Sequence, residues 1–552
     1  MKHKYKFLRA DYFSYSILFS ILFLYSCSKN ELLNNNSINN TPNYYSRIGY
    51  DIPYKEGTNI ILGKKLKNPY TVEIMNLAWQ NLAKSGIKPT STSFVFASHL
   101  YVKFKPKNSS EYETLHSDST LSFSDFPIEN EVIQNGDYYH DSSLSKCVPT
   151  FQYTSVSIDY KFPEGIDYEI IDRLYIPEID IKFNYENGGN EDLFVDELLN
   201  EAYKLTENFD DTIDISNYNQ DVSQRTYSPG GKIRVFDTRL QQWIGMEGVR
   251  VQARRWFTSY NGYPDYYGEY HINHSFKRPC NYSIWFGRDK FSVRHNVVNT
   301  TFWINGPKMS GTWSYDLINN YQRFAGHVFR GAYRYQAKDI GGLERPWLPN
   351  KRQIYVAKDG YKDWSGINWI VLPVIRVARF KTEKGDEYES DEIFSTTCHE
   401  TGHTSHVLRM NAGAIQFLQV SRQLQESWPI AIEWYLTHIE YSERGILNYG
   451  NWDYRPNTPT QYPNNQAYQY WTSNIDADYT SLFINLIDKE NDKDLWFFNG
   501  TPDDQVFGYT LPLIEQKILK HSYGLSSLGL QLKNYKPYSI TDADIDNLLN
   551  YY

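Results

Sequence analysis

The chain has 552 residues, and roughly two to four domains are expected because single cores stop growing beyond about 250–300 residues. Hydrophobic residues make up 41% of the sequence, and a mean hydropathy of -0.60 excludes a polytopic membrane protein. The formal net charge of -9 is small for this length and argues against a nucleic-acid-binding protein.

The first residues have the pattern of an export signal. A basic start is followed by the apolar run Tyr12–Tyr25, which is too short to span a bilayer comfortably. The run ends in Leu24-Tyr25-Ser26-Cys27, which resembles a lipobox. The resemblance implies that Cys27 is lipidated and becomes the new N-terminus. The alternatives are an ordinary cleaved signal and a membrane-anchor helix.

The residues after Cys27 are polar and rich in Asn and Ser, so they cannot bury surface and predict a flexible tether. Ser28 stands where an inner-membrane retention signal has Asp, and the Lys and Glu that follow resemble an export signal of surface lipoproteins. We therefore expect a signal peptide over residues 1–26, a tether over 27–41, and a lipid-anchored protein at the bacterial outer membrane or cell surface.

Cysteine usage predicts a fold without a disulfide framework. Besides Cys27, only Cys147, Cys280 and Cys398 are present, an odd number spread over separate segments.

Residues 42–226 are rich in β-branched and aromatic residues and are predicted to form an α+β region of unknown role. Period-two alternation predicts two strands, and apolar periodicity predicts two helices. These elements are the strands His99–Lys105 and Phe151–Asp159 and the helices Ile74–Leu82 and Asp192–Leu205. We interpret His140-Asp141 as a turn rather than a site.

Residues 228–306 have short strand-like runs at a spacing of about ten residues with turn residues between them, which predicts a small antiparallel β-sandwich. The runs are Lys232–Phe236, Gly245–Ala253, Glu269–Ile272, Tyr282–Phe286 and Phe291–Val293. Their order resembles the carboxypeptidase regulatory-like, or transthyretin-like, domain. The resemblance implies an accessory module without chemistry of its own, and we expect it to act as a spacer.

Residues 307–552 are predicted to form a mainly helical α+β domain. Apolar spacing predicts a helix over Tyr315–Gln336, and the β-branched run Trp369–Phe380 predicts a strand. Another helix is expected to begin at Ser390 or Asp391 and to run towards Met410. Two further helices are predicted, Tyr479–Asp488 and Ile540–Leu549.

The predicted helix before Met410 carries the motif His399-Glu400-Thr401-Gly402-His403. Residues four apart on a helix project from one face, so the two imidazoles can bind one ion. Neutral imidazole is a preferred zinc ligand, and two leave positions for a third ligand and a water. Glu400 can lie beside that water and act as general base. Such a motif is expected by chance only about 0.02 times in this chain, so it predicts one zinc ion per chain.

The third zinc ligand must come from another part of the chain. Metzincins have a Gly and a His where this chain has His406 and Arg409, so that class is excluded. Gln425–Tyr435 resembles the gluzincin segment in which a Glu is followed by a small residue, an aromatic residue and Ala, with a second Glu seven positions later. The resemblance implies a zincin-like metallopeptidase with Glu426 as ligand and Glu433 as a supporting residue.

Pro429 stands where gluzincins have Ala. Since proline is tolerated in a first helical turn, we expect this helix to begin near Ser427, with Glu426 at its mouth. Glu433 would then lie inside the helix among apolar residues, where an unpaired carboxylate is costly. It remains the alternative metal ligand, because it lies two turns from Glu426 on about the same face.

Further candidates lie near the motif. His406 is expected to be solvated or to support a ligand, and Cys398 points away from His399 and is expected in the core. A hydrogen-bond donor to the oxyanion is also needed. The sequence offers four donor candidates: Tyr435, His438, Tyr479 and Tyr509.

The sequence thus predicts a surface-anchored zinc metallopeptidase with His399, His403 and Glu426 as ligands and Glu400 as general base. The expected substrates are extracellular proteins, peptides or glycoproteins, and the expected membrane contact is through the lipid anchor. The alternative is a surface adhesin or binding protein that keeps a zincin scaffold without significant hydrolysis. An intact Glu400 argues against that alternative, because a purely structural zinc site does not need it.

Overall fold

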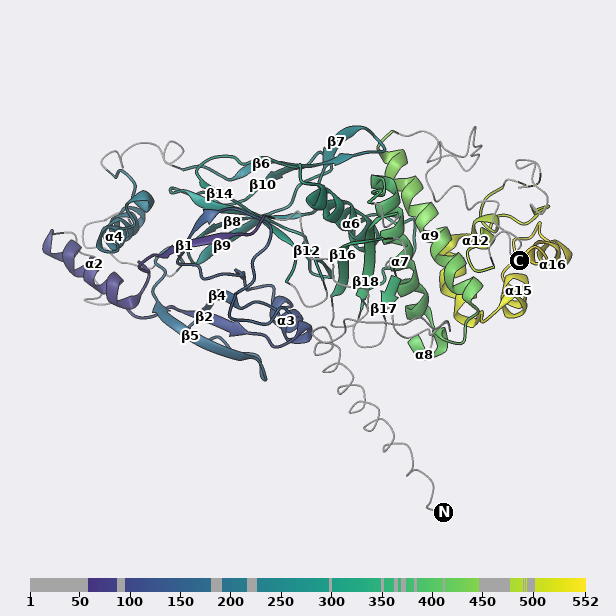
Figure 1. Cartoon of the computed structure of the whole chain (residues 1–552), viewed down its shortest axis with the longest axis horizontal. Helices are drawn as coiled ribbons and strands as arrows, with labels where there is room; N and C mark the ends of the chain where they lie inside the picture. The colour runs from purple at the N-terminus through teal and green to yellow at the C-terminus, as the bar shows by residue number, and fades with distance from the viewer. Residues whose placement is uncertain are drawn as a thin grey trace, which may run out of the picture. The chain divides into compact units, whose positions relative to one another are not determined.

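The computed structural model describes most of the chain between residues 58 and 552. The described ranges are 58–86, 95–179, 191–215, 226–296, 300–348, 352–361, 366–368, 374–381, 385–410, 413–445, 477–489, 491, 493 and 502–552. The predicted signal peptide, Cys27 and the tether lie outside these residues. Apart from Ser145–Cys147, the described residues belong to one unit of mixed α and β structure with several sheets (Figure 1).

A three-stranded antiparallel sheet with the order β4-β2-β5 lies within residues 58–215. The two predicted strands and two predicted helices are confirmed, and α2 packs against α4 through Trp79 and Phe194, whose ring centroids are 4.9 Å apart. The elements are β1 (Ile61–Lys65), α2 (Val72–Lys84), β2 (His99–Lys105), α3 (Ser109–His116), β3 (Asn130–Gln134), β4 (Gln152–Ser157), β5 (Asp167–Leu174) and α4 (Glu191–Leu205). His140 directly precedes the turn in which the backbone N of Leu144 donates to the carbonyl oxygen of Asp141, and its ring nitrogens lie near the carbonyl oxygens of Asp141 and Val148.

Two sheets that share one hydrophobic core form the predicted sandwich region. One has the order β10-β6-β15 with β7 also paired to β6, and the other has the order β14-β11-β8-β9. Their strands are β6 (Gly230–Asp237), β7 (Gln242–Gly245), β8 (Arg250–Arg255), β9 (Thr258–Gly262), β10 (Glu269–His271), β11 (Cys280–Trp285), β14 (Trp303–Met309) and β15 (Tyr315–Leu317). Most pairs are antiparallel, but β15 runs parallel to β6.

A five-stranded sheet with the order β12-β13-β16-β18-β17 crosses the predicted boundary at residue 306. Strands β13, β16 and β18 run parallel, and β12 and β17 are antiparallel to their neighbours. The strands are β12 (Gly287–Arg288), β13 (Phe291–Arg294), β16 (Gln353–Tyr361), β17 (Gly366–Asn368) and β18 (Val374–Phe380). Val293, Tyr355 and Val377 of this sheet belong to the same core as the sandwich, so the two predicted domains share both a sheet and a core.

Helices make up most of the remaining described structure (Figure 1). They are α6 (Asn320–Ala337), α7 (Ser390–Arg409), α8 (Ala414–Phe417), α9 (Arg422–Glu443), α12 (Leu482–Asn485), α14 (Leu511–Leu513), α15 (Leu525–Asn534) and α16 (Asp542–Leu549). Helix α6 contacts β13 and β16, and α7 lies against α6 and α9. The helix predicted up to Leu549 is confirmed by α16.

Two predicted helices are wrong in extent. The helix predicted from Tyr315 begins only at Asn320, because Tyr315–Leu317 pairs with β6 instead, and Asn319 caps α6 by accepting from the backbone N of Tyr321. The amphipathic pattern Tyr479–Asp488 forms only the short helix α12. In the strand predicted over Trp369–Phe380, residues 369–373 lie outside the described ones and the rest forms β18.

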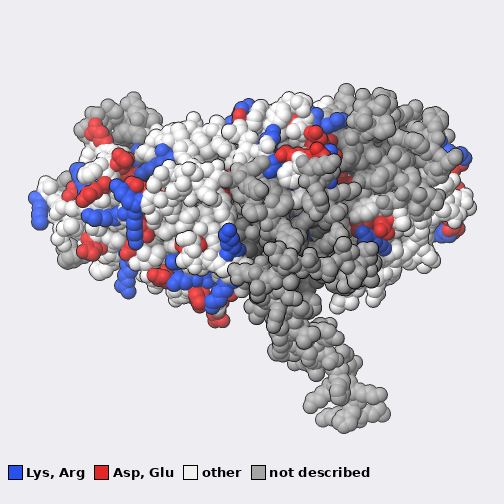
Figure 2. All heavy atoms as spheres, viewed as in Figure 1, with Lys and Arg blue, Asp and Glu red and all other residues white. Residues whose placement is uncertain are grey.

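Cys280 and Cys398 are free and buried. Among the described helices, none has the length and apolar character needed to cross a membrane. Figure 2 shows basic and acidic side chains side by side on the described part of one face. Lys105 of β2 and Glu169 of β5 form an ion pair, 2.8 Å apart.

Asp504, before α14, is a buried carboxylate that is only 5% exposed. Its Oδ1 accepts a hydrogen bond of 2.8 Å from the backbone N of Val506. Burial, with the charges of Asp488 and Asp503, raises its pKa to about 8. Since the folded-state pKa lies above the ordinary value of 3.8, this group contributes stability that is complete below about pH 4 and lost as the pH rises towards 8.

We therefore expect Asp504→Asn to be more stable than the wild type at pH 8, by on the order of 2 kcal/mol or more, and to differ little at pH 4. Urea unfolding at both pH values measures this. Asp546→Asn is the matched control, because Asp546 is exposed on α16, pairs with Lys533 at 2.6 Å and should give no such gain. Equal pH dependence of Asp504→Asn and the wild type would contradict the prediction.

Candidate metal centre

Helix α7 carries the motif His399–His403 and begins at Ser390, the earlier of the two residues at which its start is predicted. Its N-cap is Glu389, whose backbone N donates to the side chain of Glu392 over 2.7 Å in a capping box. The capped helix then runs unbroken to Arg409. This regularity places His399 and His403 one turn apart on the same face, with ring centroids 5.0 Å apart.

Helix α9 brings a carboxylate to both imidazoles. Glu426 Oε2 lies 3.3 Å from His403 Nε2 and 3.5 Å from His399 Nε2. The possible ligand atoms of His399, His403 and Glu426 all lie within 4.8 Å of one another. Among the described residues, these three form the one cluster of His, Cys, Asp or Glu side chains that could hold a metal ion. The structure therefore brings the three predicted ligands together.

The two helices meet at a glycine and a proline. A Cβ on Gly402 would lie 3.0 Å from the Cα of Pro429, so any larger residue would require the two helices to move apart by a few tenths of an ångström. Pro429 lies inside α9, which begins at Arg422, so the prediction of a helix start near Ser427 is wrong. An interior proline removes one helical hydrogen bond, and packing against α7 offsets that loss. Gly402 is thus a positioning residue, although it stands at one of the two positions that the motif leaves variable.

Glu433 lies on the opposite side of the His399 ring. Its Oε2 is 3.3 Å from His399 Nδ1, within ion-pair distance but without hydrogen-bond geometry. A carboxylate behind a ligating histidine fixes the orientation of the ring and makes it a stronger ligand. Glu426 therefore lies where a third ligand to the ion is needed, and Glu433 lies behind the His399 ring. Both residues lie on α9, two turns apart and on about the same face.

The charges at the site are buried. Burial raises the pKa of Glu400, and burial would raise that of Glu426 too, but its contacts with His399 and His403 hold the pKa of Glu426 far below its ordinary value. Burial alone would lower the pKa of His399, but the Glu426 and Glu433 carboxylates raise it.

The donor set fits a divalent cation. Glu400 Oε2 and Glu426 Oε2 are buried oxygens that accept no hydrogen bond from the described residues. Such orphaned oxygens are costly unless another group satisfies them. Two imidazole nitrogens with one carboxylate oxygen are a common zinc set that leaves a position open for water. The orphaned oxygen of Glu426 facing both imidazoles is therefore the observation that favours a metal here.

The other residues near the motif have different surroundings. His406 is fully buried with its ring against Phe417, at 5.1 Å between centroids, and burial lowers its pKa to about 3. It is therefore not solvated. Cys398 is buried in the core as predicted, with its thiol directed at the carbonyl of Gly331.

Of the four candidate donors, the structure places Tyr479 at the site. Its ring stacks on His399 with centroids 6.0 Å apart, and burial with the charges of Glu426 and Glu400 raises its pKa. Tyr509 donates to the carbonyl of Leu532, and His438 Nδ1 lies 2.6 Å from the carbonyl of Trp434. The hydroxyl of Tyr435 lies against Gly341. The sequence could not choose Tyr479, because a long segment of chain separates it from α9.

Comparison with known proteins adds no relative: no protein-family model, curated protein or solved structure matches this chain. The function of this chain is therefore inferred from the geometry of the site.

Substitutions of Glu426 and Glu433 are expected to have different effects on zinc binding. Glu426→Ala removes one of three protein ligands, so bound zinc should be lost during dialysis against a mild chelator. Glu433→Ala removes only a supporting contact, so zinc affinity should fall by about 10- to 100-fold while stoichiometric zinc can still be loaded. Bound zinc is measured by elemental analysis. A metal-free Glu433→Ala beside a loaded Glu426→Ala would exchange the two roles.

Proposed function

We propose that this chain is a zinc-dependent peptide hydrolase, anchored at the bacterial cell surface through lipidated Cys27, that acts on extracellular proteins, peptides or glycoproteins. The observation that supports it most is the convergence of His399, His403 and Glu426 with the buried, unsatisfied Glu400 in the same helix. A site that served structure alone would not need Glu400.

Zinc bound by the three ligands would polarise the scissile carbonyl and lower the pKa of the attacking water. Glu400 takes the proton of this water and later delivers it to the leaving amine. A raised pKa suits this exchange, because the ideal catalytic pKa lies near the operating pH. Glu433 orients the ring of His399. Tyr479, stacked on that ring, is the side chain that we assign as donor to the oxyanion.

Glu400→Gln tests the hydrolase directly. It removes the proton acceptor and keeps every ligand, so zinc content should stay near one per chain while hydrolysis of a peptide library falls by about 100-fold or more. Full activity in this variant would contradict the mechanism. Absence of hydrolysis in the zinc-loaded wild type would favour a surface-binding protein on the same scaffold. Loss of zinc together with activity would make Glu400 a structural residue.

The anchor is tested separately. Cys27→Ala should move the protein from the membrane fraction to the soluble fraction, because the lipid can no longer be attached. Cys147→Ser is the matched control and should remain in the membrane fraction, because it replaces a cysteine outside the lipobox-like segment and leaves Cys27 in place. Membrane retention of Cys27→Ala, measured by fractionation and immunoblotting, would place the anchor elsewhere.

A further inference from the structure

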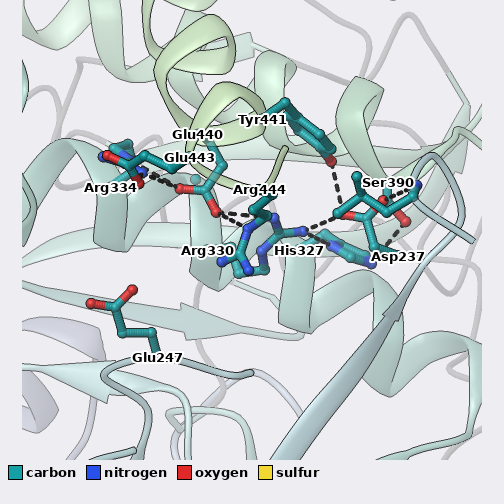
Figure 3. Close-up of polar contacts among 12 residues, drawn as sticks. Asp237, Glu247, His327, Arg330, Arg334, Ser390, Glu440, Tyr441, Glu443 and Arg444 are labelled. Atoms are coloured by element: carbon teal, nitrogen blue, oxygen red, sulfur yellow. Dashed lines mark hydrogen bonds and ion pairs between the residues drawn. The ribbon is translucent and has the colours of Figure 1, made fainter. Parts of the chain in front are cut away.

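A network of charged and polar side chains, all of them buried or half-buried except Glu443, joins the β-sandwich to the helices that carry the candidate metal ligands. It connects the end of β6 with α6, the start of α7 and the end of α9 (Figure 3). Its members are Asp237, Thr238, His327, Arg330, Arg334, Ser390, Glu440, Tyr441, Glu443 and Arg444. Asp237, Arg334 and Tyr441 are each 0% exposed. Charges buried this deeply are stable only when they are fully paired.

Asp237 is the sandwich's contribution, and it accepts four hydrogen bonds. Its Oδ1 accepts from the backbone N of Arg239 and of Leu240, both at 3.0 Å, which fixes the turn after β6. Its Oδ2 accepts from Arg330 Nη1 of α6 and from the hydroxyl of Tyr441 of α9, both at 2.9 Å. Burial would raise the pKa of Asp237, but the Arg330 guanidinium and the hydrogen bonds from the backbone N of Leu240 and the Tyr441 hydroxyl hold it below its ordinary value. The carboxylate therefore ties α9 directly to the sandwich.

The next residue of the same turn holds the start of α7. The backbone N of Thr238 donates to Ser390 Oγ over 2.8 Å, and the backbone N of Ser390 donates to Thr238 Oγ1 over 2.9 Å. His327 Nδ1 faces Arg330 and must accept, so its Nε2 carries the proton towards Ser390 Oγ, 2.9 Å away. Burial lowers the pKa of His327 to about 3, in keeping with a neutral ring.

Glu440 closes the network on α9. Its carboxylate accepts from Arg330 and Arg334 of α6 and from Arg444 at the end of α9. Arg330 lies between Glu440 and Asp237 and donates to both, as Figure 3 shows. Glu440 lies seven residues, or about two turns, beyond Glu433, so the helix that carries the third ligand is held firmly at its far end.

We propose that Asp237 and the turn that it fixes position the metal centre, so that the sandwich is part of that centre rather than a spacer. One turn holds α7, which carries two ligands, and α9, which carries the third. A shift of either helix would change the distances of 3.3 and 3.5 Å between Glu426 and the imidazoles. This inference depends on the proposed metal centre. Asp237 is a positioning residue and touches neither the ligands nor substrate.

The test uses the geometry of the bound metal instead of peptide hydrolysis. Co²⁺ reports coordination geometry through its visible absorption, and zinc affinity is measured by competition with a chelator. Asp237→Asn and Tyr441→Phe should each change the cobalt spectrum and weaken zinc binding by about tenfold, as is typical of residues that act through a ligand. Asp316→Asn is the matched control. Asp316 lies on β15 and makes an ion pair of two hydrogen bonds with Arg234, which lies on β6 as Asp237 does. The substitution breaks this ion pair, and Asp316 contacts none of the network.

A residue that only stabilises the fold would lower the melting temperature and leave the cobalt spectrum unchanged, and that result would overturn the inference while the metal centre stands. If the full-length wild type binds neither Co²⁺ nor Zn²⁺, the metal centre and this inference are both wrong. If Asp237→Asn does not fold, Tyr441→Phe decides the question, because it removes one hydroxyl and leaves every charge in place.

Discussion

The contact between α7 and α9 at Gly402 and Pro429 is the constraint on which the site depends. The two helices touch there without an intervening side chain, so the ligands on either side face each other at close range. A wider separation would carry the Glu426 carboxylate away from the imidazoles. Protein interiors are close-packed, so a change in core volume of even one methylene group destabilises the fold. The separation of the two helices at this contact is therefore tightly fixed.

The same contact explains where sequence reasoning succeeded and failed. The spacing of His399 and His403 follows from helix geometry, so the motif alone could predict that these side chains lie together. The position of Glu426 came from a resemblance, and its geometry agrees. The helix start near Ser427 was wrong because a proline was interpreted by its local preference, whereas tertiary packing places Pro429 inside α9.

Other differences arise from pairing between distant residues. Tyr315–Leu317 has helical periodicity, but it becomes a strand because β6 lies beside it, and nothing near residue 315 in the sequence indicates that neighbour. The proposed role of Tyr479 likewise depends on a contact between residues far apart in the sequence, the stacking of its ring on His399. Nor could composition predict the buried network, because arginine, aspartate and glutamate in a sequence usually indicate exposed positions.

The hydrogen bond between Asp237 and Tyr441 joins residues 204 positions apart, and this separation has a consequence for synthesis. A chain made from its N-terminus completes β6 and α6 long before α9 exists, so the carboxylate of Asp237 stays hydrated until α9 is made. Burial of this carboxylate is stable only when Arg330 and Tyr441 both donate to it, so the docking of α9 is a cooperative step. Long-range closure of this kind is slow, and a chain interrupted before α9 would present a hydrated, charged edge where the finished protein has a dry one.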